Sequence, residues 1–318
     1  MRGAISFRNR LHLGLAARRE EYEMNVLISG SSGLVGRHLM RLLRASGHGV
    51  TRLVRREPTS ADERFWDPAA GKLDPSVLEG VHAVVNLAGD NIGKGRWNDA
   101  KKKRILESRV QTAGLLADTI ARSSGKPNVF VTASAIGIYG NRGSEALSES
   151  SAAGEGFLVD VCRQWEAAAM KADVRTVLLR FGMILTPEDG ALAAMLTPFK
   201  LGVGGNMGDG KQYWSWVTLD DAVRVILFAL THAELSGPVN AVAPQPVTNA
   251  EFTRALGSVL HRPTFLPMPA FAARLALGEM ADSLILSSTR VVPTRLQSAG
   301  YEYMHPDLKG ALTALLKG

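Results

Sequence analysis

Apolar runs alternate with amphipathic stretches through roughly the first 180 residues of the chain. An apolar run at residues 24–29 meets three glycines, and leucines then recur at helical spacing over residues 39–43, which predicts a strand, a tight turn and a helix. Further strands are predicted at residues 50–54, 64–66, 81–89, 128–133 and 176–180, and further helices after Pro75 and over residues 98–120 and 157–166. This alternation is typical of an α/β fold with a doubly wound parallel sheet.

The alternation weakens after residue 190. A helix is expected over residues 192–201, and residues 202–210 are rich enough in glycine to predict a mobile loop over a ligand crevice. Residues 213–217 alternate as one half-buried strand, before Asp220 and Asp221 open another helix. From Pro238 onward, short helices between proline-containing loops predict a smaller lobe.

We divide the chain into three parts on this pattern. Residues 1–23 form a disordered extension or leader, residues 24–185 form the main α/β domain, to which later segments have room to return, and residues 186–318 form a smaller C-terminal α/β substrate lobe. The simplest reading of the first part is an over-extended start or a disordered tail, because Met24 stands just before the first strand. An arginine-rich organellar leader is the competing interpretation.

The first turn carries the chemistry of a dinucleotide site. Gly30 permits a tight turn, Gly33 lets the backbone approach a pyrophosphate, and Gly36 allows the helix to pack on the strand. The helix that follows points its free N–H groups at an anion. The strand at residues 81–89 also ends in small residues, Ala88 and Gly89, that let a cofactor lie against the backbone.

The end of the second strand indicates which dinucleotide is bound. An acidic residue there would bind the 2′-hydroxyl of the adenosine ribose. This chain has Arg55 and Arg56 instead, and their permanently charged guanidinium groups suit a 2′-phosphate. We therefore expect NADP, with NAD as the alternative because Glu57 is adjacent.

Composition and charge exclude several classes of protein. The chain has 318 residues, 46% of them hydrophobic and 21% charged, and no apolar run long enough to span a membrane. Its single cysteine, Cys162, rules out an intramolecular disulfide and fits a reducing, cytoplasmic compartment, with organellar import as the alternative if the N-terminus is a leader. We interpret Cys162 as a small buried hydrophobe rather than a nucleophile.

The net charge of +7 is spread widely, and its densest cluster is Lys101–Arg104. A solvated helix face explains this cluster better than nucleic-acid binding, because no aromatic residues are interleaved with it. No spacing of metal ligands is evident, so no metal site is expected.

Ser134 and Tyr139 lie in a predicted loop at residues 134–140, at the carboxyl edge of the sheet where ligands bind.

With these residues in hand, the chain resembles the extended short-chain dehydrogenase/reductases, and within them an epimerase family with a C-terminal domain of unknown function. The resemblance covers residues 24–318, with that C-terminal domain at residues 262–318. It rests on NLAGDNI (86–92), GRW (95–97), SRV (108–110), GVGG (202–205), WVTLDD (216–221), LPMP (266–269), GEMA (278–281), PTRL (293–296) and AGY (299–301).

The resemblance implies a Rossmann-like NADP-binding domain, and some related proteins are linked to cell or organelle division. The implied cofactor contacts are Gly30, Ser31, Gly33, Leu34, Val35, Arg55, Leu87, Ala88, Arg109 and Ile184. The competing interpretation of Arg109 is an ordinary surface salt bridge.

Catalysis departs from the pattern of the superfamily. Its Tyr-x-x-x-Lys pair, in which the lysine lowers the pKa of the tyrosine, would fall here on Leu158 and Cys162. Ser134 and Tyr139 remain as catalytic candidates, with Lys94, Arg96 or Lys200 as conceivable sources of a cation. We therefore predict an NADP-dependent oxidoreductase, or a nucleotide-sugar epimerase-like enzyme, with non-standard catalytic residues and an unidentified small-molecule substrate. The alternatives are a non-catalytic NADP-binding sensor or regulatory partner, and nucleic-acid binding through the basic helix.

Overall fold

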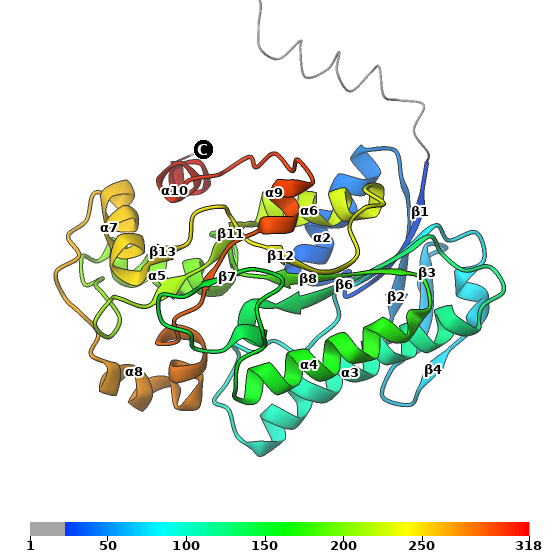
Figure 1. The fold of residues 1–318 in the computed structure, drawn as a ribbon, viewed down its shortest axis with the longest axis horizontal. Coiled ribbons are helices and arrows are strands. Elements are labelled where there is room, and N and C mark those ends of the chain that lie inside the picture. The colour runs from blue at the N-terminus through cyan, green and yellow to red at the C-terminus, as the bar shows by residue number, and fades with distance from the viewer. Residues whose placement is uncertain (1–22, 318) are drawn as a thin grey trace, which may run out of the picture.

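The computed structural model describes residues 23–317, and its centre is an eight-stranded sheet (Figure 1). The strands lie in the order β12-β8-β6-β5-β1-β2-β3-β4, and all neighbours are parallel except β3 and β4. Their bounds are β1 Asn25–Ser29, β2 Gly49–Val54, β3 Glu63–Asp67, β4 Lys72–Leu73, β5 Ala83–Asn86, β6 Val129–Ala135, β8 Arg175–Phe181 and β12 Gly237–Ala241.

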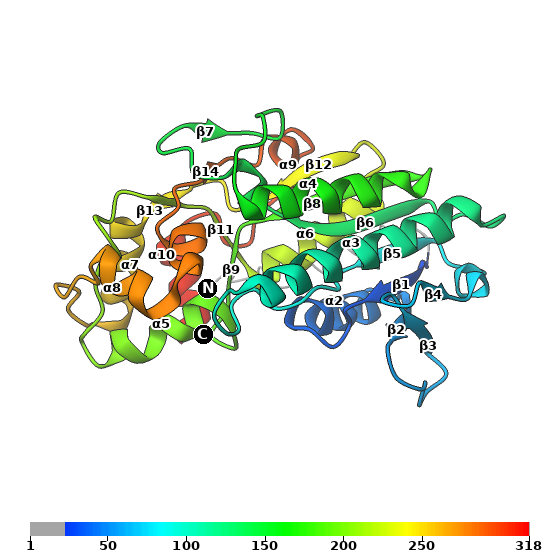
Figure 2. The same ribbon diagram turned by 90° about the horizontal axis from the view of Figure 1, so that it is seen from below.

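Helices cover both faces of the sheet, as the alternation of strands and helices predicts. On one face lie α2 (Leu34–Ala45) and α6 (Leu219–Thr231), which pack on Val26, Ile28 and their neighbours in β5, β6 and β8. On the other face lie α3 (Asp99–Arg122) and α4 (Phe157–Ala169), which pack on Leu27, Phe130 and the residues beside them. Figure 2 shows α3 and α4 running side by side along one face of the sheet. Alternate residues of each strand therefore enter two separate cores.

The last strand of the sheet comes from late in the chain. Residues 237–241 form β12, which pairs in parallel with β8 from Gly237 opposite Val177 to Ala241 opposite Phe181. The expectation that the chain from Pro238 onward belongs to the smaller lobe is wrong for these residues. Pro238 argued against a strand in the sequence, because proline cannot donate a backbone hydrogen bond. Proline is nevertheless tolerated on an edge strand such as β12, because one side of that strand has no partner.

The smaller lobe has its own core. Its helices are α5 (Gly190–Lys200), α7 (Asn249–Leu260), α8 (Ala270–Leu277) and α10 (Leu308–Lys317). Helix α9 (Thr294–Ser298) packs on β12 instead, and its Leu296 joins the core that α2 and α6 form with the large sheet. Two-stranded ladders join β9 (Met183–Leu185) to β11 (Trp216–Thr218), β10 (Tyr213–Trp214) to β13 (Val247–Thr248), and β7 (Ala146–Leu147) to β14 (Arg290–Val291). Residues of α5, α7 and α10 gather around Trp214, Trp216 and Phe252.

Two local expectations for this lobe need correction. The single strand predicted at residues 213–217 is divided into β10 and β11, which pair with different partners on either side of the buried Ser215. Residues 202–210 are held down by backbone hydrogen bonds, from Met268 N to Asn206 O (2.8 Å) and from Gly208 N to Met268 O (2.9 Å). The glycines of residues 202–210 therefore reflect close packing rather than the mobile loop that we expected. A Cβ on Gly205, for example, would overlap the Leu266 carbonyl.

Candidate functional site

The turn after β1 has the shape of an anion cradle. Gly30 has a φ of +72°, and a Cβ there would lie 2.6 Å from the carbonyl of Leu87. A Cβ on Gly36 would lie 2.4 Å from Gly30 O, whereas a Cβ on Gly33 would approach only that same oxygen, at 3.3 Å. Gly30 and Gly36 are therefore required for packing within the protein, and exposed Gly33 is the glycine with room for a ligand.

The start of α2 is open to an anion. Gly33 is its N-cap and offers no side-chain oxygen to the first N–H groups, and the first turn contains no acidic residue. These N–H groups and the positive end of the helix dipole thus have no negative side chain to satisfy them. The residues present fit a bound pyrophosphate.

The residues that the resemblance assigns to a cofactor are divided between the two faces of the sheet. Leu34 and Val35 from α2, Leu87 after β5, and Ile184 from β9 all pack against the same apolar core while keeping part of their surface exposed. Ala88 packs on the opposite core, Gly89 is exposed, and Ser31 is buried in the turn. The assignment of these residues to cofactor contacts stays a prediction.

A polar ladder that sequence reasoning missed supports the turn. The Ser29 hydroxyl donates to Asn86 Oδ1 (2.6 Å), and Asn86 Nδ2 donates to Thr132 Oγ1 (3.1 Å). All three side chains are fully buried, one on each of β1, β5 and β6. The ladder ties the ends of β1 and β5 to the middle of β6, and the polar residues that end or interrupt these apolar runs were the available signal.

The two arginines after β2 differ in their surroundings. Arg56 donates to both carboxylate oxygens of Glu63, at 2.6 and 2.9 Å, and so is committed to the protein. Arg55 is exposed, and within residues 23–317 its guanidinium makes no hydrogen bond or ion pair with another side chain. Both arginines were expected to bind a 2′-phosphate, but of the two only Arg55 has a guanidinium group available for one.

Arg109 lies beneath the loop that follows β5. Its guanidinium donates to Asp90 O (3.1 Å) and Ile105 O (3.0 Å), and it stacks 5.3 Å from the ring of Trp165. Burial lowers the pKa of this group, although arginine stays charged. The surface salt bridge considered as an alternative is not what the structure shows, since Arg109 is a half-buried cation between α3, α4 and the end of β5.

The basic cluster on α3 does not form one solvated face. Lys101 is buried, and its ammonium contacts Asp90 (2.5 Å) and Asn91 O (2.6 Å). Lys102 binds Glu279 at 2.8 Å and lies 4.8 Å from the ring of Phe157. Only Lys103 and Arg104 point outward, so the expectation of a solvated basic face is wrong for half of the cluster.

Ser134 and Tyr139 belong to one buried network. The Ser134 hydroxyl donates to Glu166 (2.6 Å), and Glu166 accepts two hydrogen bonds from Arg180, at 2.8 and 2.9 Å. Arg180 also donates to the Tyr139 hydroxyl (2.9 Å), which in turn donates to Asn240 Oδ1 (2.7 Å). The network therefore links β6, α4, β8 and β12.

This arrangement limits the chemistry of both hydroxyl groups. Each proton is directed at a buried acceptor, and Tyr139 has no exposed surface while Ser134 is 3% exposed. Burial raises the pKa of Tyr139, and Arg180 opposes only part of that rise. The cation beside Tyr139 is thus Arg180, rather than Lys94, Arg96 or Lys200, and it does not produce a reactive phenolate.

Cys162 matches its prediction as a buried, unreactive residue. It is 3% exposed, and burial, reinforced by the charge of Glu166, raises the pKa of its thiol to about 12. A thiol of this kind is almost entirely protonated at neutral pH and is a poor nucleophile.

Arg180 was the strongest sign of the buried network that the sequence analysis missed, because an arginine inside the apolar run of β8 requires a buried partner.

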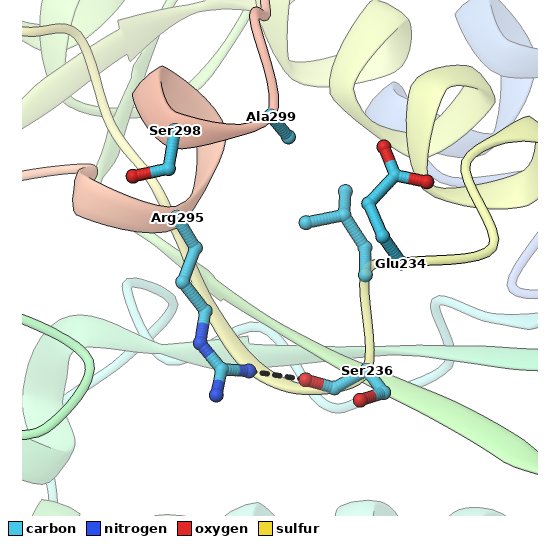
Figure 3. A pocket seen from close by; sticks show the side chains of 6 residues that line it. Glu234, Ser236, Arg295, Ser298 and Ala299 are labelled. Atoms are coloured by element: carbon cyan, nitrogen blue, oxygen red, sulfur yellow. Dashed lines mark hydrogen bonds between the residues drawn. The ribbon is translucent and has the colours of Figure 1, made fainter.

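A separate hollow of about 270 Å³ lies between β12 and α9 (Figure 3). Arg295 reaches across it to donate to the carbonyl of Ser236, and also to Pro238 O at 3.1 Å. The hollow lies at the amino end of β12, whereas ligands of parallel sheets bind at the carboxyl ends. It is therefore distinct from the cradle at Gly30.

Within residues 23–317, no three His, Cys, Asp or Glu side chains gather as a metal site. No helix in that same range is long and apolar enough to cross a membrane.

The sheet order and the glycine turn define a Rossmann-like α/β fold. The chain belongs to the NAD dependent epimerase/dehydratase family, whose model matches residues 26–242, and a domain of unknown function, DUF1731, matches residues 268–315. The family and C-terminal domain predicted from the sequence motifs are thus confirmed.

Relatives support this assignment along nearly the whole chain. An epimerase family protein of Mycobacterium leprae is 43% identical over 91% of this chain and 94% of its own length. A chloroplastic homologue of SDR39U1 from Arabidopsis thaliana is 38% identical over 95% of this chain and 90% of its own. The crystal structure of human epimerase family protein SDR39U1 (isoform 2) with NADPH matches with a TM-score of 0.85 and 34% identity, covering 93% of this chain and all of that one.

Proposed function

We propose that this protein binds NADP(H) at the carboxyl edge of the sheet. The observation that carries the proposal is the uncapped, acid-free start of α2 beside the Gly30 turn, which fits a pyrophosphate. Arg55 would hold the 2′-phosphate, because it is the exposed arginine after β2. The human relative crystallised with NADPH supports this choice of cofactor.

A comparison of the two arginines tests the cofactor proposal. We expect Arg55→Ala to weaken NADPH binding about 10- to 100-fold, since a charge-assisted contact contributes roughly 1.5–3 kcal/mol, and to leave NADH binding nearly unchanged. Arg56→Ala is the matched control, because its guanidinium is bound to Glu63. Fluorescence titration measures both affinities. An absence of saturable NADPH binding, or equal losses in the two variants, would contradict the proposal.

We further propose that the protein is an oxidoreductase in which neither Ser134 nor Tyr139 transfers the proton. Bound NADPH supplies a hydride in such chemistry. Both hydroxyl protons are committed to buried acceptors, so the proton that accompanies the hydride would come from water. Arg109, which lies close to Gly89, would attract a negatively charged group of the cofactor or substrate.

The buried network also favours a second candidate function, an NADP(H)-binding sensor without turnover. A screen of carbonyl substrates for NADPH consumption separates the two. If the rate of NADPH consumption falls by no more than about 3-fold in Tyr139→Phe and in Ser134→Ala, the result supports the non-standard oxidoreductase. A fall of about 100-fold or more would instead show that these residues act in catalysis. Saturable NADPH binding without turnover across the screen favours the sensor.

A further inference from the structure

The segment 269–279, which contains α8, is anchored to the smaller lobe at both ends. Just before it, Met268 N donates to Asn206 O at 2.8 Å. Shortly after it comes a π-helical turn at Ala281–Ile285, whose last carbonyl accepts a hydrogen bond from Trp214 Nε1 at 3.1 Å. We call residues 269–279 the α8 strap, because both of its ends are fixed.

Little holds the strap in place between these two anchors. Ala273 is its only buried residue, whereas Met280 and Ala281, which follow it, are 8% and 0% exposed. An isolated helix of eight residues is unstable in water, and segments with few buried contacts open at a low cost in free energy. The strap can therefore change position while both of its ends stay attached.

Polar contacts join the strap to the main domain. The Lys102 ammonium contacts both carboxylate oxygens of Glu279, at 2.8 and 3.0 Å. Arg96 Nη2 donates to Leu275 O at 3.3 Å, and it lies 3.6 Å from the place where a Cβ on Gly278 would be. The strap thus binds the start of α3 through one cation and the loop before α3 through the other.

These contacts lie at the edge of the sheet where the cofactor is proposed to bind. Helices α3 and α4 follow β5 and β6, and so begin at the carboxyl ends of those strands. Figure 2 shows the smaller lobe beyond one end of these helices, and the contact of Lys102 with the strap identifies it as the end where they begin. Arg96 lies in the loop that starts at Leu87, whose carbonyl lies against Gly30. Residues 87–97 therefore connect the glycine turn to the strap.

The strength of these contacts suits a segment that opens and closes. The side chains of Lys102 and Glu279 are 29% and 46% exposed, and an ion pair of this kind shifts an equilibrium by no more than about 5-fold. A buried pair such as Arg180 with Glu166 could not serve in this way, because its separation leaves uncompensated charges in the core. A site that covers its ligand needs the weaker kind of contact, since the ligand must enter and leave.

We propose that the α8 strap closes over bound NADP(H), and that the ion pair of Lys102 with Glu279 is the latch that holds it closed. The proposal rests on the proposed function, since it requires a cofactor at the glycine turn. In the closed position the strap is joined to α3 and to the loop at residues 87–97. Bound NADPH leaves after the latch has opened, so the latch slows its dissociation without touching it.

Stopped-flow displacement of NADPH by excess NADP⁺ measures the dissociation rate. We expect Lys102→Glu and Glu279→Lys each to raise this rate about 5-fold, and the double exchange to return it to within about 3-fold of the unmodified chain. An effect of charge on the anionic cofactor alone would instead give changes of opposite sign, because Glu279→Lys would then slow dissociation. The matched control is the pair of Lys126 with Asp173 (2.6 Å), near the other end of α3, whose exchange should leave the rate unchanged.

Hydrogen exchange of residues 269–279 without NADPH follows the strap itself. We expect faster exchange in both single variants and its return in the double exchange. Equal dissociation rates in all variants, changes of opposite sign in the single variants, or unchanged hydrogen exchange would each overturn the latch. An unmodified chain that binds no NADPH would refute the proposed function, and with it the closing of the strap over a cofactor. Faster exchange in the single variants would in that case still support the ion pair as the contact that holds the strap.

Discussion

Replacement of Gly30 by alanine should be among the most damaging single-methyl additions in the chain. Gly30 has a φ of +72°, and its missing Cβ would lie 2.6 Å from both the carbonyl carbon and the oxygen of Leu87, and 2.8 Å from Ala88 N. All three atoms are backbone, so no side chain can rotate to make room. The new methyl group must therefore displace the end of β5 or the turn itself.

The magnitude follows from two contributions. A left-handed backbone costs an L-residue roughly 1–2 kcal/mol, and overpacking adds about 1–3 kcal/mol. We therefore expect Gly30→Ala to lower the free energy of unfolding by about 2–5 kcal/mol. Gly47→Ala separates the two contributions, because Gly47 has a φ of +84° but nothing within 4 Å of the added Cβ, so only the backbone strain of roughly 1–2 kcal/mol remains.

Urea unfolding followed by circular dichroism measures both variants, and NADPH titration follows the site. If the overlap with Leu87 governs the loss, Gly30→Ala is clearly less stable than Gly47→Ala and binds NADPH more weakly even where it is folded. Equal stabilities would refute the reasoning, since they would mean that β5 and the turn separate at little cost. Unchanged NADPH affinity in folded Gly30→Ala would show that the cradle is not the binding site.

Three further outcomes are expected. Glu166→Gln should destabilise the protein by about 3–5 kcal/mol in urea unfolding, because Arg180 is left as a buried uncompensated charge, whereas Glu145→Gln on the exposed Arg142 should change it by no more than about 1 kcal/mol. The hydrogen bond from Arg56 lowers the pKa of Glu63 from the usual 4.5 to about 2. The stability that ionised Glu63 contributes is therefore fully present above pH 4.5 and is lost as the pH falls toward 2. Melting temperatures measured over this pH range should fall less steeply in Glu63→Gln than in the unmodified chain. Cys162 should react with a thiol reagent at least about 100-fold faster in urea than in the native state, and rapid native labelling would contradict its burial.

The central sheet was largely predictable because its strands bury both faces. Runs such as residues 26–28 and 83–85 contain only apolar residues, and the helices between them repeat leucine or alanine at helical spacing. The helix predicted over residues 98–120 is α3, and Asn98 caps its start, since Asn98 Oδ1 accepts from Lys101 N at 2.8 Å. Local patterning and burial agree in this part of the chain.

The errors lie where distant segments meet. No local pattern reveals that residues 237–241 pair with β8, or that residues 202–210 are fixed by residues 266–268. Arg55 and Arg56 are neighbours in sequence, yet Glu63 selects only one of them. The sequence identified Ser134 and Tyr139 as hydroxyl groups near the expected crevice, but the acceptors of their protons come from α4 and β12.

The return of the chain to the sheet at β12 also affects synthesis on the ribosome. Until residues 237–241 have emerged, β8 is an open edge with unpaired backbone groups, and Asn240 is not available to the Tyr139 hydroxyl. The segment 182–236 separates the two strands and must be made first, and it contains α5 of the smaller lobe as well as α6. The large sheet therefore cannot be completed until the first part of that lobe has been made, and a nascent chain halted before residue 237 should be prone to aggregation through β8.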